Sequence, residues 1–156
     1  LKKILTPVDP NFVDLRSPIG SGTGQLAYNY NGKIYPSDEG RMVSAMGDEF
    51  FALGEVGKSS YDELVNHPTV KTIAMSSILD TLPACSTCWN APYCGVRPLH
   101  NYMNNKDLFA QRPVTLKCKE NMKISQLLFT RLLHDKDGTM EKIFNRWTLD
   151  RPRQQE

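Results

Sequence analysis

The stretch Cys85-Ser-Thr-Cys88-Trp-Asn-Ala-Pro-Tyr-Cys94 places three thiols within ten residues, and the last cysteine of the chain, Cys118, follows after a gap of 23 residues. Two thiolates separated by two residues can approach one centre from a single tight turn. Five further residues let the chain curl over the opposite side of that centre and present the third thiolate. We therefore expect Cys85, Cys88, Cys94 and Cys118 to bind a metal ion or an iron–sulfur cluster.

The spacing leaves the kind of metal open, because structural zinc and [4Fe–4S] clusters both accept four thiolates. Zinc ribbons usually pair one Cys-x2-Cys motif with a second one, whereas this pattern is asymmetric. The bulky Trp89, Pro92 and Tyr93 stand inside the ligand loop, where we expect them to screen a cluster from water. Two disulfides are a further alternative, which the sequence disfavours because the chain is long for a disulfide scaffold and shows no secretory signal.

The composition is that of an ordinary globular protein, with 40% hydrophobic and 23% charged residues. A length of 156 residues corresponds to one domain, or to one domain with an appendage. The net charge of +2 argues neither for nor against a nucleic-acid partner, and no apolar run reaches the ~18 residues of a membrane span. We expect a cytoplasmic protein that binds neither nucleic acid nor membrane.

Local patterns predict an α+β fold made of a short antiparallel β-hairpin, a cysteine-rich loop and packed α-helices. The hairpin covers 26–35, and its Asn31-Gly32 dipeptide predicts a type I′ turn. Ser60 and Glu63 have the spacing of a capping box. Helices are expected over 37–46, 60–67, 69–82, 121–134 and 139–147, with Thr139 capping the last of them and the cysteine segment 83–101 forming a loop.

The chain divides into four parts in this reading. Residues 1–24 are rich in proline and glycine and end in Gly20-Ser-Gly-Thr-Gly24, which predicts a flexible linker without a cofactor role. A cluster-binding domain follows over 25–125, then C-terminal helices over 126–150 and a polar tail over 151–156. Because the chain begins at Leu1 with sequence typical of the middle of a protein, we expect a fragment whose preceding domain lies upstream.

Several of these motifs together resemble the SPASM domain, the auxiliary domain of radical S-adenosylmethionine enzymes that modify peptides. The resemblance covers about residues 25–125. It is carried by Gly32-Lys-Ile-Tyr-Pro36, by Leu53-Gly54-Glu-Val56, and by the Cys-x2-Cys-x5-Cys motif with its Pro92-Tyr93-Cys94-Gly95 and a distant fourth cysteine. The run Tyr35-Pro-Ser-Asp-Glu-Gly-Arg41 looks most like the maturases of His-Xaa-Ser repeat peptides.

The sequence departs from the family pattern at two positions. Ser37 stands near the cysteine that usually follows the hairpin, and Pro98 stands four residues beyond Cys94, where another cysteine is usual. The resemblance therefore implies that one of the two auxiliary clusters of the family is missing. The ligands of the other cluster map onto the four cysteines of this chain, and the resemblance implies that this cluster is [4Fe–4S]. Its role would be electron transfer, shaping of the substrate channel, or both.

The resemblance also implies a division of labour within a longer enzyme. The chain has no Cys-x3-Cys-x2-Cys motif, so it cannot cleave S-adenosylmethionine and carries no catalytic residue of its own. The expected partners are an N-terminal radical S-adenosylmethionine barrel of the same protein and a precursor peptide. Asp38, Glu39 and Arg41 are candidates for contacting that peptide, or a solvated helix start. The alternative function is a zinc-stabilised interaction module without a redox role.

Overall fold

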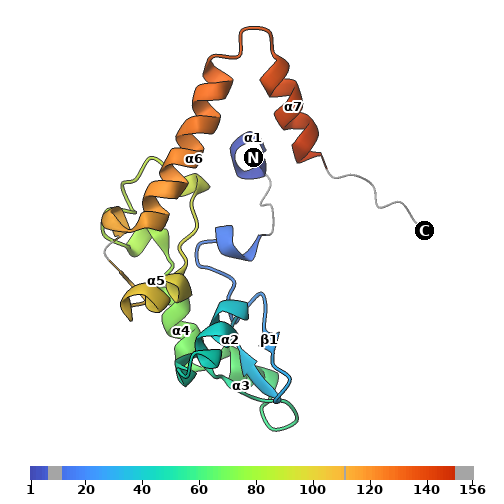
Figure 1. Cartoon of the computed structure of the whole chain (residues 1–156), viewed down its shortest axis with the longest axis vertical. Coiled ribbons are helices and arrows are strands. Elements are labelled where there is room, and N and C mark those ends of the chain that lie inside the picture. Colours follow the sequence, from blue (N-terminus) through green and yellow to red (C-terminus); the bar gives the residue numbers. More distant parts are fainter. Residues whose placement is uncertain (7–11, 111, 150–156) are drawn as a thin grey trace, which may run out of the picture. The chain divides into compact units, whose positions relative to one another are not determined.

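The computed structural model of the chain describes residues 1–6, 12–110 and 112–149. These residues form seven α-helices, five short 3₁₀-helices and a three-stranded antiparallel sheet (Figure 1). The α+β fold expected from the sequence is therefore confirmed. The chain falls into two compact units, here called unit 1 (Leu1–Pro10 with Leu116–Glu156) and unit 2 (Asn11–Thr115).

Unit 2 contains the sheet, the cysteine loop and most of the short helices. Its strands are β1 (Ala27–Tyr28), β2 (Lys33–Tyr35) and β3 (Gly54–Glu55), its α-helices are α2 (Asp38–Ala45), α3 (Tyr61–Val65), α4 (Pro68–Met75) and α5 (Pro98–Asn105), and its 3₁₀-helices are η1 (Val13–Leu15), η2 (Glu49–Phe51), η3 (Leu79–Thr81), η4 (Ala91–Tyr93) and η5 (Arg112–Val114). Unit 1 contains α1 (Lys2–Leu5), α6 (Leu116–Leu133) and α7 (Thr139–Thr148).

These units do not follow the division predicted from the sequence. The boundary lies between 115 and 116 instead of at 125, and the described part of the supposed linker from residue 12 onward belongs to unit 2. The predicted tail over 151–156 lies outside the described residues.

The hairpin forms where the sequence predicts it, but its turn is of another kind. Strands β1 and β2 pair with Ala27 opposite Tyr35, and β3 joins the free edge of β2. The amide of Gly32 donates to the carbonyl of Asn29 over 3.0 Å, so the turn is centred on Tyr30 and Asn31. Gly32 has φ +83°, whereas Asn31 has no positive φ. The prediction of a type I′ turn is wrong, because the chain uses a three-residue loop that ends in a left-handed glycine.

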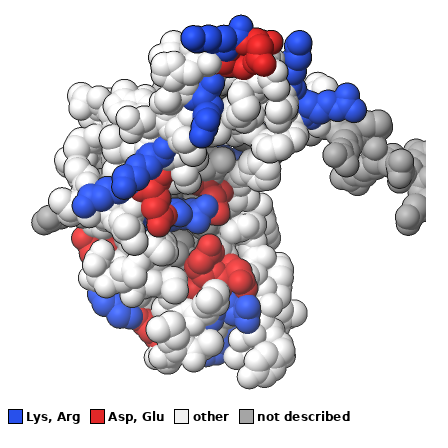
Figure 2. All heavy atoms as spheres, turned by 45° about the horizontal axis from the view of Figure 1, so that its top comes forward, with Lys and Arg blue, Asp and Glu red and all other residues white. Residues whose placement is uncertain are grey.

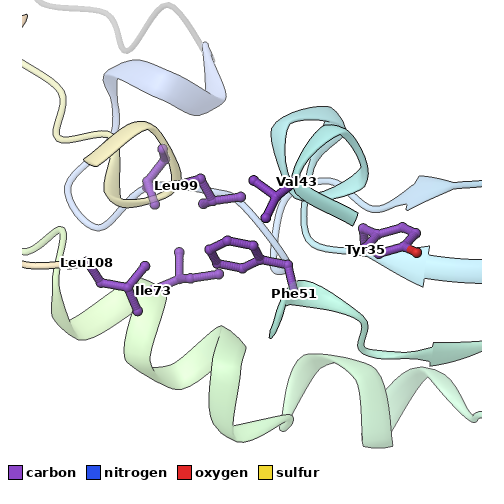
Figure 3. Packing of buried hydrophobic residues seen from close by; sticks show 7 residues of the cluster. Tyr35, Val43, Phe51, Ile73, Leu99 and Leu108 are labelled. Atoms are coloured by element: carbon purple, nitrogen blue, oxygen red, sulfur yellow. The ribbon is translucent and has the colours of Figure 1, made fainter. Parts of the chain in front are cut away.

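The main core of unit 2 lies where η2 meets α2, α4 and α5. Figure 3 shows Phe51 from η2 reaching between Val43 of α2 and Ile73 of α4. The complete cluster consists of Ile19, Tyr35, Val43, Phe51, Ile73, Leu99 and Leu108. A second cluster under the sheet joins Ile34, Leu53, Leu64 and Val70. Side chains of the sheet, of the helices and of the connecting segments are thus buried against one another. A sheet this small needs such packing to be stable.

Two helix predictions need correction at their ends. The capping box at Ser60 and Glu63 is present, as predicted, and begins α3. The helix expected over 69–82 ends at Met75, because the hydroxyls of the buried Ser76 and Ser77 donate back to carbonyls of the last turn. The segment predicted as loop over 83–101 contains the start of α5, which opens with Pro98 at its first position.

The glycine stretch 20–24 is packed against the rest of unit 2. The amide of Gly22 donates to the carbonyls of Pro36 and Gln25 over 2.8 and 3.0 Å. Gly22 also has φ +84°, and a Cβ at this position would lie 2.7 Å from a methyl group of Val70. The sequence prediction of a flexible segment is therefore wrong: the glycine is required by a close approach and a left-handed backbone.

In unit 1, α6 begins at Leu116, five residues before the predicted start at 121. The carboxylates of Asp135 and Asp137 accept hydrogen bonds from the first amides of α7, so they cap this helix in place of the predicted Thr139. Phe144 is buried as expected of the inward face of α7, whereas Trp147 is exposed.

The surface carries charges of both signs. Figure 2 shows acidic and basic side chains interspersed on the face drawn, and several of them form ion pairs, such as Lys33 with Glu49 and Lys106 with Asp48. Among the described residues, none of the helices combines the length and the apolar composition that a membrane-spanning segment needs.

Candidate metal centre

The cysteine loop is built from consecutive tight turns. The amide of Cys85 donates to the carbonyl of Leu82 over 3.0 Å, and the amide of Cys88 donates to the carbonyl of Cys85 over 3.0 Å. The next two turns repeat this pattern. The amide of Ala91 donates to the carbonyl of Cys88 over 3.0 Å, and the amide of Cys94 donates to the carbonyl of Ala91 over 3.2 Å. Each cysteine thus stands at the end of a turn, and the chain curls continuously from the first thiol to the third.

Two of the three thiols of the loop rest on the same apolar surface. Leu79, Leu82 and Val96 form a small buried cluster, and the partly buried Cys85 and Cys94 pack against it. Cysteines nine positions apart therefore lie on one hydrophobic support. This support also shields one side of the loop from water, which favours thiolate–metal bonds over hydration.

The N-terminal segment of unit 2 lies directly over the end of the loop. A Cβ on Gly95 would collide with the carbonyl oxygen of Asp14, so the two backbones are in contact. The guanidinium of Arg97 forms an ion pair with Asp14 over 3.2 Å. Ser17 accepts a hydrogen bond from the amide of Leu79 over 2.9 Å. Residues that the sequence assigned to a linker therefore form part of the wall of the candidate centre.

The side chains inside the loop are arranged differently from what the sequence predicts. Trp89 is 52% exposed and Pro92 is exposed, so neither covers the loop as expected. Tyr93 is half-buried. The buried residue of this stretch is Asn90, whose side chain is 1% exposed. Its Oδ1 atom has no hydrogen-bond partner among the described residues. Nothing in the local pattern of the sequence distinguished this asparagine.

Cys118 belongs to unit 1, whereas the other three cysteines belong to unit 2. It lies in the first turn of α6, and its Sγ is 3.9 Å from the Sδ of Met122. The sequence analysis placed Cys118 just before a helix expected to begin at 121. This position is wrong, because α6 already begins at Leu116.

All four cysteines are thiols with partly buried side chains. Among the residues that the structure describes, no three histidine, cysteine, aspartate or glutamate side chains form a group that could hold a metal ion. The loop thiols Cys85, Cys88 and Cys94 therefore share a turn-built loop without converging on a point. Thiols are donors that zinc and iron–sulfur clusters accept, and loading a metal would require these side chains to close around it.

The candidate peptide contacts have local partners. The guanidinium of Arg41 pairs with the carboxylate of Asp38 over 2.7 Å, one turn away on α2. The hydroxyl of the buried Ser37 donates to Glu39 over 2.6 Å at the start of the same helix. These contacts stabilise the first turn of α2, which agrees with the interpretation of the three residues as a helix start.

Comparison of the chain with protein-family models, with curated proteins and with solved structures finds no match.

Proposed function

We propose that the chain binds one [4Fe–4S] cluster through Cys85, Cys88, Cys94 and Cys118, as the auxiliary domain of a radical S-adenosylmethionine enzyme that modifies a ribosomally made precursor peptide. The observation that carries the proposal is the cysteine loop: three thiols at the ends of tight turns in one continuous run, two of them on one apolar support. The resemblance to the SPASM domain supports the finer assignment to a peptide-modifying enzyme.

The four thiolates would saturate the cluster, so no iron would remain open for a substrate. A bound cluster of this kind would supply one-electron transfer, or would fold the loop and shape the substrate channel. The residues of the chain would bind and shield it: Leu79, Leu82 and Val96 exclude water from one side, and the segment around Asp14 closes over the end of the loop. The S-adenosylmethionine site and the substrate radical are proposed to lie in a barrel of the same protein.

The second candidate is a zinc-stabilised interaction module without a redox role. The observation that favours it is the exposure of Trp89 and Pro92, which leaves the outer side of the loop open to solvent. A structural zinc ion tolerates such a position because it has no redox chemistry to protect.

Metal and sulfide analysis of the anaerobically purified and reconstituted chain tests both candidates. The cluster proposal expects about four irons and four sulfides per chain, with the broad thiolate–iron absorption. Cys88→Ser should abolish most of this iron, while Thr87→Ala, an exposed neighbour in the same loop, should retain it.

One zinc ion per chain without sulfide, even after anaerobic reconstitution, would replace the cluster proposal by the zinc module. A chain that retains neither iron nor zinc would contradict both candidates.

A further inference from the structure

Unit 1 buries few of its apolar side chains. Its helices α6 and α7 form a helical hairpin (Figure 1). Among the described residues, Phe144 of α7 is the one buried hydrophobic side chain of unit 1, and all others belong to unit 2. The long helix α6 buries only Ser125, and α1 buries no residue. Because helices in water obtain most of their stability from packing an apolar face, this hairpin lacks much of the stabilisation that such packing provides.

The solvent side of α6 carries apolar side chains along most of its length. Leu116, Ile124 and Leu127 are 73%, 55% and 56% exposed. In a helix of about 3.6 residues per turn their spacing places them on one side, and the buried Ser125 lies on the other. These residues therefore form an exposed apolar stripe, which is more than the scattered apolar side chains of an ordinary surface.

Basic side chains accompany this stripe. Lys119, Lys123 and Arg131 are exposed on the same side of α6. The acidic residue of this side, Glu120, is paired with Lys117 over 2.9 Å. The three exposed cations form no ion pair with a described residue. The surface defined here as the α6 face consists of Leu116, Lys119, Lys123, Ile124, Leu127 and Arg131.

The described residues of unit 1 are basic as a whole. Residues 1–6 and 116–149 contain nine lysines and arginines and four aspartates and glutamates, a formal net charge of +5. Residues 12–110 and 112–115 of unit 2 contain eight and ten, a net charge of −2. The excess of positive charge therefore occurs in the unit that leaves its apolar side chains exposed. Because like charges repel, this excess opposes an association of two copies through the α6 face.

The arrangement of the α6 face disfavours a lipid surface as the partner. Helices that lie in a membrane interface keep their charges on one side and a continuous apolar face on the other. In α6, Lys123 stands between Leu116 and Leu127 along the helix and on the same side. Immersing the two leucines would bring this ammonium group toward the acyl chains, which is costly. A protein partner can instead place a carboxylate opposite each cation and apolar side chains between them.

We propose that the α6 face binds an acidic amphipathic helix of another protein. Apolar side chains of the partner, spaced by three and four residues, cover the three apolar side chains of the face. Aspartates and glutamates beside them pair with the three cations. Burial of apolar surface supplies the affinity, and the complementary charge selects the partner. The inference concerns unit 1 alone and does not depend on the proposed metal centre.

The test uses the complete chain and a labelled synthetic peptide of about 21 residues, roughly six helical turns. The peptide has leucines spaced by three and four residues and glutamates at the flanking positions. We expect saturable binding by fluorescence anisotropy and slower amide exchange over 116–133 in the complex. A second peptide with lysine in place of every glutamate should bind about 10-fold more weakly or less, because it places like charges opposite the cations.

Substitutions in the chain locate the binding surface. Lys123→Glu should weaken binding of the acidic peptide about 10-fold at low salt, and this difference should shrink near 1 M salt. Lys71→Glu, at an exposed lysine of α4, makes the same change in net charge and should leave the Kd unchanged. Leu127→Gln should weaken binding about 10-fold at every salt concentration, because it removes an apolar contact. Met75→Gln is its control, since that side chain is exposed to a similar extent, 61%.

Four outcomes would overturn the inference. The first is that the acidic peptide does not bind, and the second is that it binds no better than the lysine peptide or equally well to Lys123→Glu and Leu127→Gln. Binding of the chain to phosphatidylserine–phosphatidylcholine vesicles through these two residues, without peptide binding, would make the partner a membrane. A dimer in sedimentation equilibrium that Leu127→Gln abolishes would make the partner a second copy. None of these measurements involves a metal, so the inference can fail while the proposed cluster stands, and the reverse.

Discussion

The core around Phe51 and the cysteine loop belong to the same compact unit but are stabilised in different ways. The core joins side chains from a strand, three helices and the segments between them, and Tyr35, Phe51 and Ile73 are completely buried in it. The loop consists of single turns, keeps its thiols only partly buried, and leaves the side-chain Oδ1 of Asn90 without a hydrogen-bond partner among the described residues. The core therefore gains its stability from side chains of distant segments, whereas the loop is ordered by short backbone turns and a small apolar cluster.

The largest effect is expected from a substitution that removes the centre of the core. Phe51→Ala should lower the free energy of unfolding by about 3–5 kcal/mol, because it removes a fully buried ring from a packed cluster. Urea denaturation with and without metal measures this loss, which should be similar in both. Tyr30→Ala is the control, since that ring is 99% exposed. A large loss confined to the metal-loaded protein would mean that the core depends on the centre.

Cys88→Ser should remove the metal-dependent part of the stability while sparing the core. At a metal concentration about 100-fold above its Kd, the wild-type chain should gain roughly 3 kcal/mol that the variant lacks. Amide hydrogen exchange should show faster exchange over 83–120 and unchanged protection in the hairpin over 26–35. Equal protection of the loop in variant and wild type would count against the metal site.

Gly95→Ala should loosen the contact between the loop and the N-terminal segment. The added methyl group collides with the carbonyl of Asp14, and relieving this overlap should cost about 1–3 kcal/mol. Exchange should accelerate over 12–19 and 82–97. Gly57→Ala, which strains a left-handed backbone at φ +77° but whose new methyl group meets no neighbour, should leave exchange in these two segments unchanged.

The smallest effect concerns the polar contacts that join η2 to α5. Lys106 and Tyr102 donate to the carboxylate of Asp48 over 2.6 and 3.0 Å, and the bond from Lys106 is the main cause that lowers the pKa of Asp48 from 3.8. The ionised Asp48 carboxylate therefore contributes its full stabilisation of the folded state at pH values above the pKa that Asp48 has in the unfolded chain. This contribution is lost as the pH falls through the lower pKa of Asp48 in the folded state.

Stability measured from roughly pH 5 to pH 3 should fall less steeply in Asp48→Asn than in the wild type. Asp80→Asn, which changes an exposed carboxylate, serves as the control. An unchanged slope in Asp48→Asn would show that this carboxylate contributes nothing to the acid sensitivity of the core.

Local features of the fold were predictable because short stretches of sequence control them. The capping box of α3 depends on Ser60 and Glu63 alone, and α2 follows from an acidic first turn before an apolar run. The errors arose where the local signal was ambiguous. Asn31-Gly32 suits more than one turn type, and the stretch after Pro68 remains helical in pattern although the buried Ser76 and Ser77 end the helix.

The sequence by itself determined the places of the hairpin and of most helices, and the four cysteines with their spacing, because these depend on neighbours a few positions away. Only the tertiary structure decided that Asp14 covers Gly95, that Asn90 is buried in place of Trp89, and that Cys118 stands in a helix of the other unit. Such features depend on which distant segments meet and which side chains fit between them, and a local pattern carries no information about either.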